Sequence, residues 1–179
     1  MTTREHFLKP LLAAFPPQPM PVRFFWKQGV HDASDEFCRD LLERLWRREW
    51  TEIKMSDWAW IGSAIGMSRA HLEPATFLYY LPSLLLGVIE EPRYLELALE
   101  AIIPLGRDRR PKSKWWGELL ETISPDQSAT IRAFLAHVRS DLLRSDKEPF
   151  VVSGDEVLTD EAETFWDAQI RSSTSRTKR

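Results

Sequence analysis

A basic segment followed by two tryptophans is the part of this sequence whose residue types could hold a nucleic acid. Residues 106–114 contain five bases and one acid, and two tryptophans follow directly. Bases neutralise phosphates and indole rings stack on nucleobases. The net charge of −3 and the pI near 5.9 argue against such a partner, and favour a solvated loop that pairs with the acidic segment 146–167. The candidate binding residues here are Arg107, Arg109, Arg110, Trp115 and Trp116.

Adjacent aromatic residues raise the question of which side chains face the core. Trp115 and Trp116 fall on one predicted helix and point about 100° apart, so we expect one of them at a surface or an interface. Tyr79 and Tyr80 lie in a segment that is apolar on nearly every face, which predicts burial. Buried hydroxyls need partners, and the backbone carbonyl that Pro82 frees within the same helix is a candidate.

Three further tryptophans lie on apolar stripes at helical spacing, where core packing or contact between helices is the expected role. They are Trp46, Trp60 and Trp166. The 8 tryptophans of the chain therefore mark helix contacts more than a binding cleft.

Catalysis and metal binding have no local signature in this sequence. The 4 histidines have no His or Cys at ligand spacing, and Cys38 is the 1 cysteine, which excludes a disulfide framework and a Cys-based zinc site. The 7 glycines form no phosphate-binding loop. The sequence predicts no metal and no cofactor, and it argues against an enzyme while leaving open a site assembled from distant residues.

Elements that position these residues are predicted to be helices throughout. Apolar residues recur at helical spacing in successive segments, and no segment shows the period-two pattern of a half-buried strand. The fold class is therefore all-α, as a single-domain bundle of six or seven helices. The clearest predicted helices cover residues 2–15, 34–49, 55–65, 74–89, 93–103 and 125–142, the last with Ser124 as its N-cap and Gln127 completing a capping box.

One predicted helix is the centre of this bundle. Pro74 suits its first turn, and the residues from Phe77 to Ile89 are apolar on nearly every face, which in a globular protein indicates a helix surrounded by others. Pro82 lies inside it and predicts a kink. A pocket beside the kink, lined by Tyr79, Tyr80 and tryptophans, is one way in which the chain could bind a small molecule.

Composition divides the chain into a helical domain over residues 1–170 and a disordered basic tail over residues 171–179. Four prolines between Pro16 and Pro21 predict an extended connector after the first helix. Residues 145–170 contain eight acids against one base and form an acidic extension, whose last helix is expected to begin at Thr159.

The segment from Leu72 to Leu85, with its Leu-x-Pro start and its Phe-x-Tyr-Tyr-Leu-Pro core, resembles the signature of an uncharacterised family of small bacterial proteins. A second element, Ile123–Gln127 with a Phe-Leu pair downstream, is similar to another signature of that family. The resemblance covers about residues 50–143 and implies the boundaries of the fold and a bacterial origin for the protein. It supplies no activity, cofactor or site residue.

Location and function follow from what the sequence lacks. The N-terminus has no secretory signal, and the longest apolar stretch, residues 77–89, is shorter than the roughly 18 residues that span a bilayer. A cytoplasmic protein without a membrane partner is expected.

The leading hypothesis for function is a non-catalytic protein-interaction module, of a toxin-neutralising or accessory kind, whose partner is a second protein with a basic surface. The alternatives are the small-molecule or enzyme pocket beside the kinked helix and, second, nucleic-acid binding through residues 107–116; homo-oligomerisation stays open.

Overall fold

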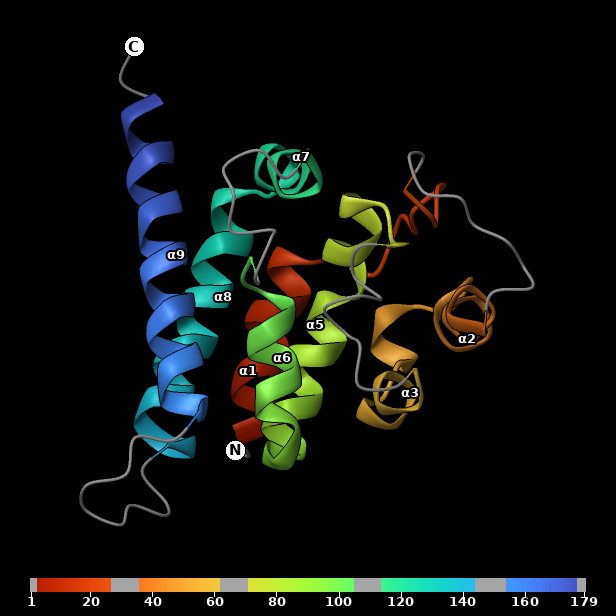
Figure 1. Ribbon diagram of the computed structural model, residues 1–179, viewed down its shortest axis with the longest axis horizontal. Coiled ribbons are helices and arrows are strands. Elements are labelled where there is room, and N and C mark those ends of the chain that lie inside the picture. The colour runs from red at the N-terminus through yellow and green to blue at the C-terminus, as the bar shows by residue number, and fades with distance from the viewer. Residues whose placement is uncertain (1–2, 27–35, 62–70, 105–113, 144–153, 177–179) are drawn as a thin grey trace.

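The structure is a computed structural model that describes residues 3–26, 36–61, 71–104, 114–143 and 154–176. Its described part contains eight α-helices and no β-strand beyond one isolated bridge, so the predicted all-α class is confirmed (Figure 1). The α-helices are α1 (Thr3–Ala14), α2 (Glu36–Leu45), α3 (Met55–Trp60), α5 (Pro74–Glu90), α6 (Leu95–Ala101), α7 (Lys114–Thr122), α8 (Pro125–His137) and α9 (Gly154–Arg176). Shorter elements are the 3-10 turns η1 (Trp50–Glu52) and η2 (Pro92–Tyr94) and the π-helix η4 (Val138–Leu142).

The predicted central helix is α5. Every residue from Phe77 to Val88 is buried, and the helix packs against α1, α3, α6, α7 and η1, which surround it (Figure 1). The helix continues through Pro82 to Glu90. Next to this proline, Ser83 donates the hydrogen of its hydroxyl group to the backbone carbonyl of Tyr80 in the same helix, at 2.6 Å. A helix with apolar residues on all sides is stable in this position because its neighbours cover each face.

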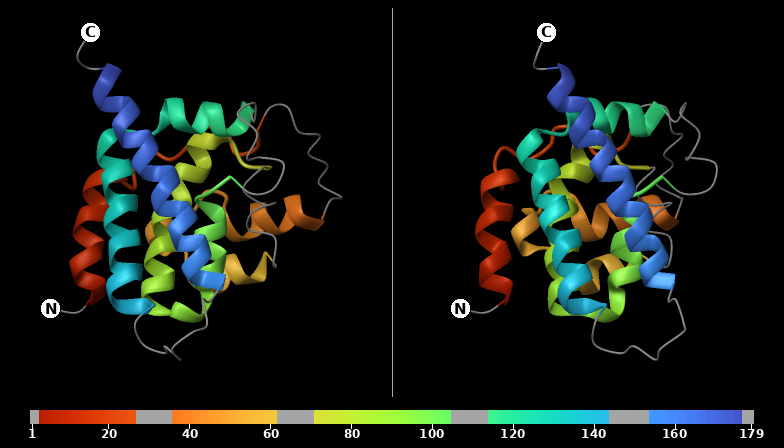
Figure 2. Two further views of the ribbon diagram at one scale, coloured as in Figure 1. Left: turned by 60° about the vertical axis from the view of Figure 1, so that its left-hand side comes forward. Right: turned by 90° about the vertical axis from the view of Figure 1, so that its left-hand side faces the viewer.

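Helices α8 and α9 form an outer layer of the bundle, with α9 running along α8 and α6 (Figure 2). The predicted start of α8 is confirmed, since Ser124 Oγ accepts from Gln127 N at 3.1 Å and Gln127 Oε1 accepts from Ser124 N at 2.9 Å. Trp166 anchors α9 by donating its indole N–H to the carbonyl of Ile102 at 2.9 Å. One hydrophobic core therefore extends from α1 to α9.

The proline-rich connector after α1 lies against the N-terminal end of α5. Phe25 forms an antiparallel bridge with Leu72, and the backbone N–H of Glu73 donates to the carbonyl of Phe24 at 2.9 Å. Trp50 donates its indole N–H to the carbonyl of Phe15 at 2.9 Å. The connector is thus held by backbone and indole hydrogen bonds to distant segments.

The C-terminal helix is longer than predicted at both ends. It begins at Gly154, and Thr159, the predicted N-cap, is a buried residue within the helix that donates to the carbonyl of Asp155 at 2.6 Å. Acidic side chains in the first turn favour the earlier start, because their negative charges interact favourably with the positive end of the helix dipole. The helix continues to Arg176, although disorder is predicted from Arg171, because extending a formed helix adds one hydrogen bond per residue.

Candidate functional site

Both tryptophans of the predicted binding pair are buried. Trp115 and Trp116 are each 4% exposed, so the prediction that one of them lies at a surface is wrong. The reason is that α7 has a neighbour on each side. Trp115 packs its ring 5.5 Å from that of Phe77 on α5, and Trp116 packs 5.4 Å from that of Phe165 on α9. Two directions about 100° apart are therefore both covered by the core.

The basic residues that precede this pair, Arg107, Arg109 and Arg110, lie outside the described residues. The proposed nucleic-acid segment therefore has no described cation except Lys114. Its indole rings are packed between α5 and α9. Buried rings cannot stack on nucleobases, so the structure gives this alternative no stacking platform.

Tyr79 and Tyr80 are buried as predicted, but their hydroxyls bind carbonyls outside their own helix. Tyr79 donates to Pro17 O at 2.8 Å, and Tyr80 donates to Leu45 O at 2.6 Å. Leu45 is the last residue of α2, and carbonyls at a helix C-terminus have no partner within the helix. The two hydroxyls therefore join α5 to the connector and to α2. Burial raises the pKa of Tyr80 well above its usual value.

Trp60 on α3 is 65% exposed, which makes it the most exposed aromatic side chain among the described residues. Of the two predicted roles, core packing and contact between helices, the structure shows the second, and the core position is excluded for a geometric reason. Trp58 and Trp60 are two residues apart and so point to opposite sides of a helix, and Trp58 is fully buried. The Arg44 guanidinium lies over the Trp60 ring, 4.6 Å from its centroid. A cation in this position is attracted to the ring face.

Helix α2 adds a second exposed aromatic residue to the same region. Phe37 is 37% exposed, and Arg44 follows it by seven residues, so both lie on one face of α2. Helices α2 and α3 pack against each other. We call the area formed by Phe37, Arg44 and Trp60 the α2–α3 surface.

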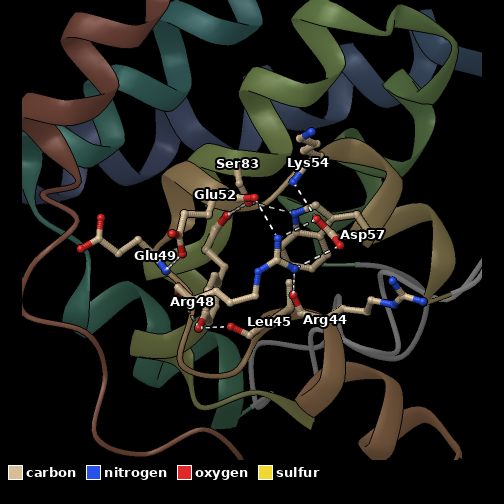
Figure 3. A network of polar contacts seen from close by, with 10 residues as sticks. Arg44, Leu45, Arg48, Glu49, Glu52, Lys54, Asp57 and Ser83 are labelled. Carbon is tan, nitrogen blue, oxygen red and sulfur yellow. Dashed lines mark hydrogen bonds and ion pairs between the residues drawn. The ribbon is translucent and has the colours of Figure 1, made fainter.

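A single arginine holds the elements beneath this surface together. Arg48 Nη1 donates to Arg44 O at 2.6 Å and to Asp57 Oδ1 at 3.1 Å (Figure 3). Its Nη2 donates to Glu52 O at 2.9 Å and to Asp57 Oδ2 at 3.3 Å. The guanidinium therefore connects the C-terminal end of α2, the η1 turn and the first turn of α3. Its bidentate ion pair with Asp57 restricts the orientation of both side chains in addition to pairing their charges.

Local conformation explains why the chain presents Arg48 in this way. Arg47 has a φ of 62°, in the left-handed region that commonly follows a helix, and α2 accordingly ends at Leu45 and not at the predicted residue 49. Asp57 also accepts from Lys54 N at 2.9 Å, which satisfies the backbone N–H of the N-cap residue of α3. In Figure 3 the side chain of Arg44 extends away from this network, where it reaches Trp60. Sequence reasoning missed these residues because their partners lie in different elements.

Two hollows lie against α5, the helix beside which a ligand pocket is predicted near Pro82. One, of about 380 Å³, is lined by Tyr79 and by residues of the proline-rich connector. The other, of about 510 Å³, is lined by Trp50, Lys54, Ser83 and Glu90 among others, on the C-terminal half of the helix. The aromatic residues that line these two hollows are Phe15 and Tyr79 in the first and Trp50 in the second, and Tyr80 lines neither.

The described residues contain no group of three His, Cys, Asp or Glu that could hold a metal ion. The fold does bring Cys38 and His71 together, with Sγ 3.9 Å from Nδ1, although the two are distant in sequence. Cys38 is 1% exposed, as predicted for a buried thiol. Within the same described ranges, no helix has the length and apolar character needed to cross a bilayer.

Comparison with known families places most of the chain in one of them. A model described as a family of unknown function (DUF6714) matches residues 31–170. The match is wider than the resemblance predicted over residues 50–143, and it includes the α2–α3 surface and much of α9. Searches of curated proteins and of solved structures give no match.

Proposed function

The chain belongs to DUF6714, a family of unknown function, and we propose that it works as a protein-interaction module that binds its partner through the α2–α3 surface. The observation that carries this proposal is the exposed Trp60 with Arg44 stacked on it. Trp and Arg are enriched among the residues that dominate binding energy at protein interfaces. An exposed indole that is already held in place loses little conformational freedom on binding.

Rigidity beneath the surface supports this role. Arg48 and Asp57 fix α3 against α2, and Tyr80 fixes the end of α2 against the central helix. The positions of Arg44 and Trp60 are therefore determined before a partner arrives. Preorganised side chains of this kind favour binding because less ordering has to accompany the complex.

Charge indicates the kind of partner. The chain has a net charge of −3 and a pI near 5.9, so long-range attraction favours a basic protein. The partner we propose has an apolar pocket for the Trp60 ring within a basic surface. A toxin-neutralising or accessory role is one form of this function. A cytoplasmic setting, which a chain with one cysteine and hence no internal disulfide favours, belongs to the same proposal.

The test compares Trp60→Ala with a matched control in the full chain. Proteins from the native host that the tagged parent captures are identified, purified and titrated against each variant by calorimetry. We expect Trp60→Ala to weaken binding by at least about 2 kcal/mol, as for a residue that dominates an interface. Val157→Ala removes another exposed apolar side chain, on α9, and should leave affinity unchanged.

Circular dichroism of each variant shows whether the helical content is preserved. Trp60→Ala should keep it, because the indole lies outside the core. A purified partner that binds Trp60→Ala as tightly as the parent contradicts the proposal. So does a partner whose affinity falls equally with Val157→Ala, since the loss would not then belong to the α2–α3 surface.

A further inference from the structure

Helices α1 and α8 enclose a groove of about 540 Å³ on a different side of the central helix from the α2–α3 surface. From α1 it is lined by Thr3, His6 and Phe7, at the three- and four-residue spacing of one helix face. His137 and Asp141 line it from the end of α8 and the π-helix that follows. π-helical turns occur often at functional sites, because the wider turn displaces side chains from their regular positions.

A histidine and a carboxylate are paired within this groove. His137 Nδ1 lies 2.6 Å from Asp141 Oδ2, and the His137 side chain is 12% exposed while that of Asp141 is 61% exposed. The carboxylate can only accept, so Nδ1 carries the hydrogen and the imidazole of His137 is held in one orientation. The remaining carboxylate oxygen of Asp141 is accessible to a ligand.

No lysine or arginine is among the described residues that line the groove. Arg139 lies on the same π-helix but binds Asp160 and Glu163 on α9. Among the described residues, Asp141 is therefore paired with a histidine and with no guanidinium.

The floor of the groove is aromatic and helical. The Phe7 ring lies between two imidazoles, with its centroid 5.5 Å from that of His6 and 4.8 Å from that of His137. Pro10 also lines the groove, and because it has no N–H it cannot donate to the carbonyl of His6 one turn earlier. The groove thus combines an apolar floor with hydrogen-bond acceptors and one carboxylate.

We propose that this groove binds an organic ammonium ligand. The ammonium group would bind the Asp141 carboxylate, and its hydrocarbon part would cover Phe7. The carboxylate suits an ammonium group through charge-assisted hydrogen bonds, and the apolar lining of the groove, which includes Phe7, Pro10 and Ala133, gives the alkyl part a surface to pack against. A metal ion does not fit, since the described residues supply no group of three ligands.

The test titrates the ¹⁵N-labelled full chain with n-butylammonium and follows amide shifts by NMR. We expect saturable shifts confined to α1, α8 and the π-helix. The neutral probe 1-butanol should bind at least tenfold more weakly, because it lacks the charge that Asp141 recognises. Equal binding of the two probes would overturn the proposal.

Two variants test the site separately. Asp141→Asn removes the charge, and Ala133→Met fills the groove from an exposed position on α8 while leaving Asp141 in place. Each should lower the affinity for n-butylammonium at least tenfold. Glu43→Gln on α2 removes the same charge elsewhere and should have no effect. If Glu43→Gln lowers affinity as much as Asp141→Asn, or Ala133→Met leaves it unchanged, the groove is not the site.

Discussion

Tryptophan side chains join distant parts of this chain through their indole N–H groups. A buried indole keeps its hydrogen-bonding group only if it finds an acceptor, and here the acceptors lie far away in the sequence. The donor and acceptor pairs are Trp26 with Glu118, Trp50 with Phe15 O, Trp58 with Ser83, Trp115 with Leu72 O and Trp166 with Ile102 O. Each of these residues therefore combines apolar burial with a directional tertiary contact. Trp60 differs, and its exposure is what directs attention to the α2–α3 surface.

Tyr80 supplies the sharpest pH prediction at the residue scale. Burial raises its pKa in the folded protein, so above the ordinary tyrosine pKa of about 10 the unfolded chain loses a proton that the native state keeps. The free energy of unfolding should therefore fall as pH rises above about 10. Tyr80→Phe should make this fall less steep and should lower stability at pH 7 by about 1 kcal/mol, through loss of the hydrogen bond to Leu45 O.

Urea unfolding of parent and variant between pH 7 and 11 measures both effects. Phenylalanine fills the same space and cannot ionise, so the comparison isolates the hydroxyl. A variant whose stability falls above pH 10 as steeply as that of the parent would show that Tyr80 is not the group responsible.

At the scale of elements, two helical glycines have opposite surroundings. A Cβ built on Gly87 of α5 lies 3.0 Å from the Cβ of Met55 on α3, whereas one built on Gly117 of α7 meets no described residue within 4 Å. The close approach of α3 to α5 therefore depends on the missing side chain at position 87. Helix α7 has no such neighbour at position 117.

Alanine at these two positions should change stability in opposite directions. Gly87→Ala should destabilise the protein by about 1–3 kcal/mol, because α3 must move away from α5. Gly117→Ala should stabilise it by about 0.5–1 kcal/mol, because alanine favours the helix and meets no obstacle. Thermal and urea unfolding measure both. Equal changes in the two variants would mean that helix propensity, and not the contact with Met55, decides the outcome.

At the scale of the whole molecule, α9 is attached by both apolar and ionic contacts. Trp166 lies in the core, and Arg139 pairs with Asp160 and Glu163 while Arg132 pairs with Asp167. The hydrogen bonds that Arg139 donates to Glu163 and Asp160 raise the pKa of its guanidinium. At least three of the eight acidic residues of the segment 145–170 are therefore used within the fold, so that fewer carboxylates remain for a partner.

Arg139→Gln should weaken the attachment of α9. These side chains are partly exposed, so we expect a loss of at most about 1 kcal/mol at low salt. The loss should shrink in 1 M salt, where roughly 3 Å screening lengths suppress such pairs. Arg93→Gln, which breaks an exposed pair with neighbouring Glu91, is the matched control and should give no measurable change. An Arg139→Gln effect that is unchanged in high salt would indicate lost packing instead of lost charge.

The sequence by itself determined the helical class, the central place of α5 and the start of α8. Each depends on local information, namely apolar spacing, a proline at a first turn and the Ser124 capping box, which act within one or two turns. The resemblance over residues 50–143 likewise anticipated membership of a family without a known activity.

Only the tertiary structure decided which aromatic side chains are covered. Trp115 and Trp116 lie on different faces of α7 and are both buried because α5 lies on one side and α9 on the other. Trp60 lies on an apolar stripe yet is exposed because Trp58 already occupies the buried side of α3. The spacing of residues along a helix determines where a side chain points, and the neighbours that cover it come from segments dozens of residues away. The candidate surface and the α1–α8 groove could therefore be found only once the helices had been placed against one another.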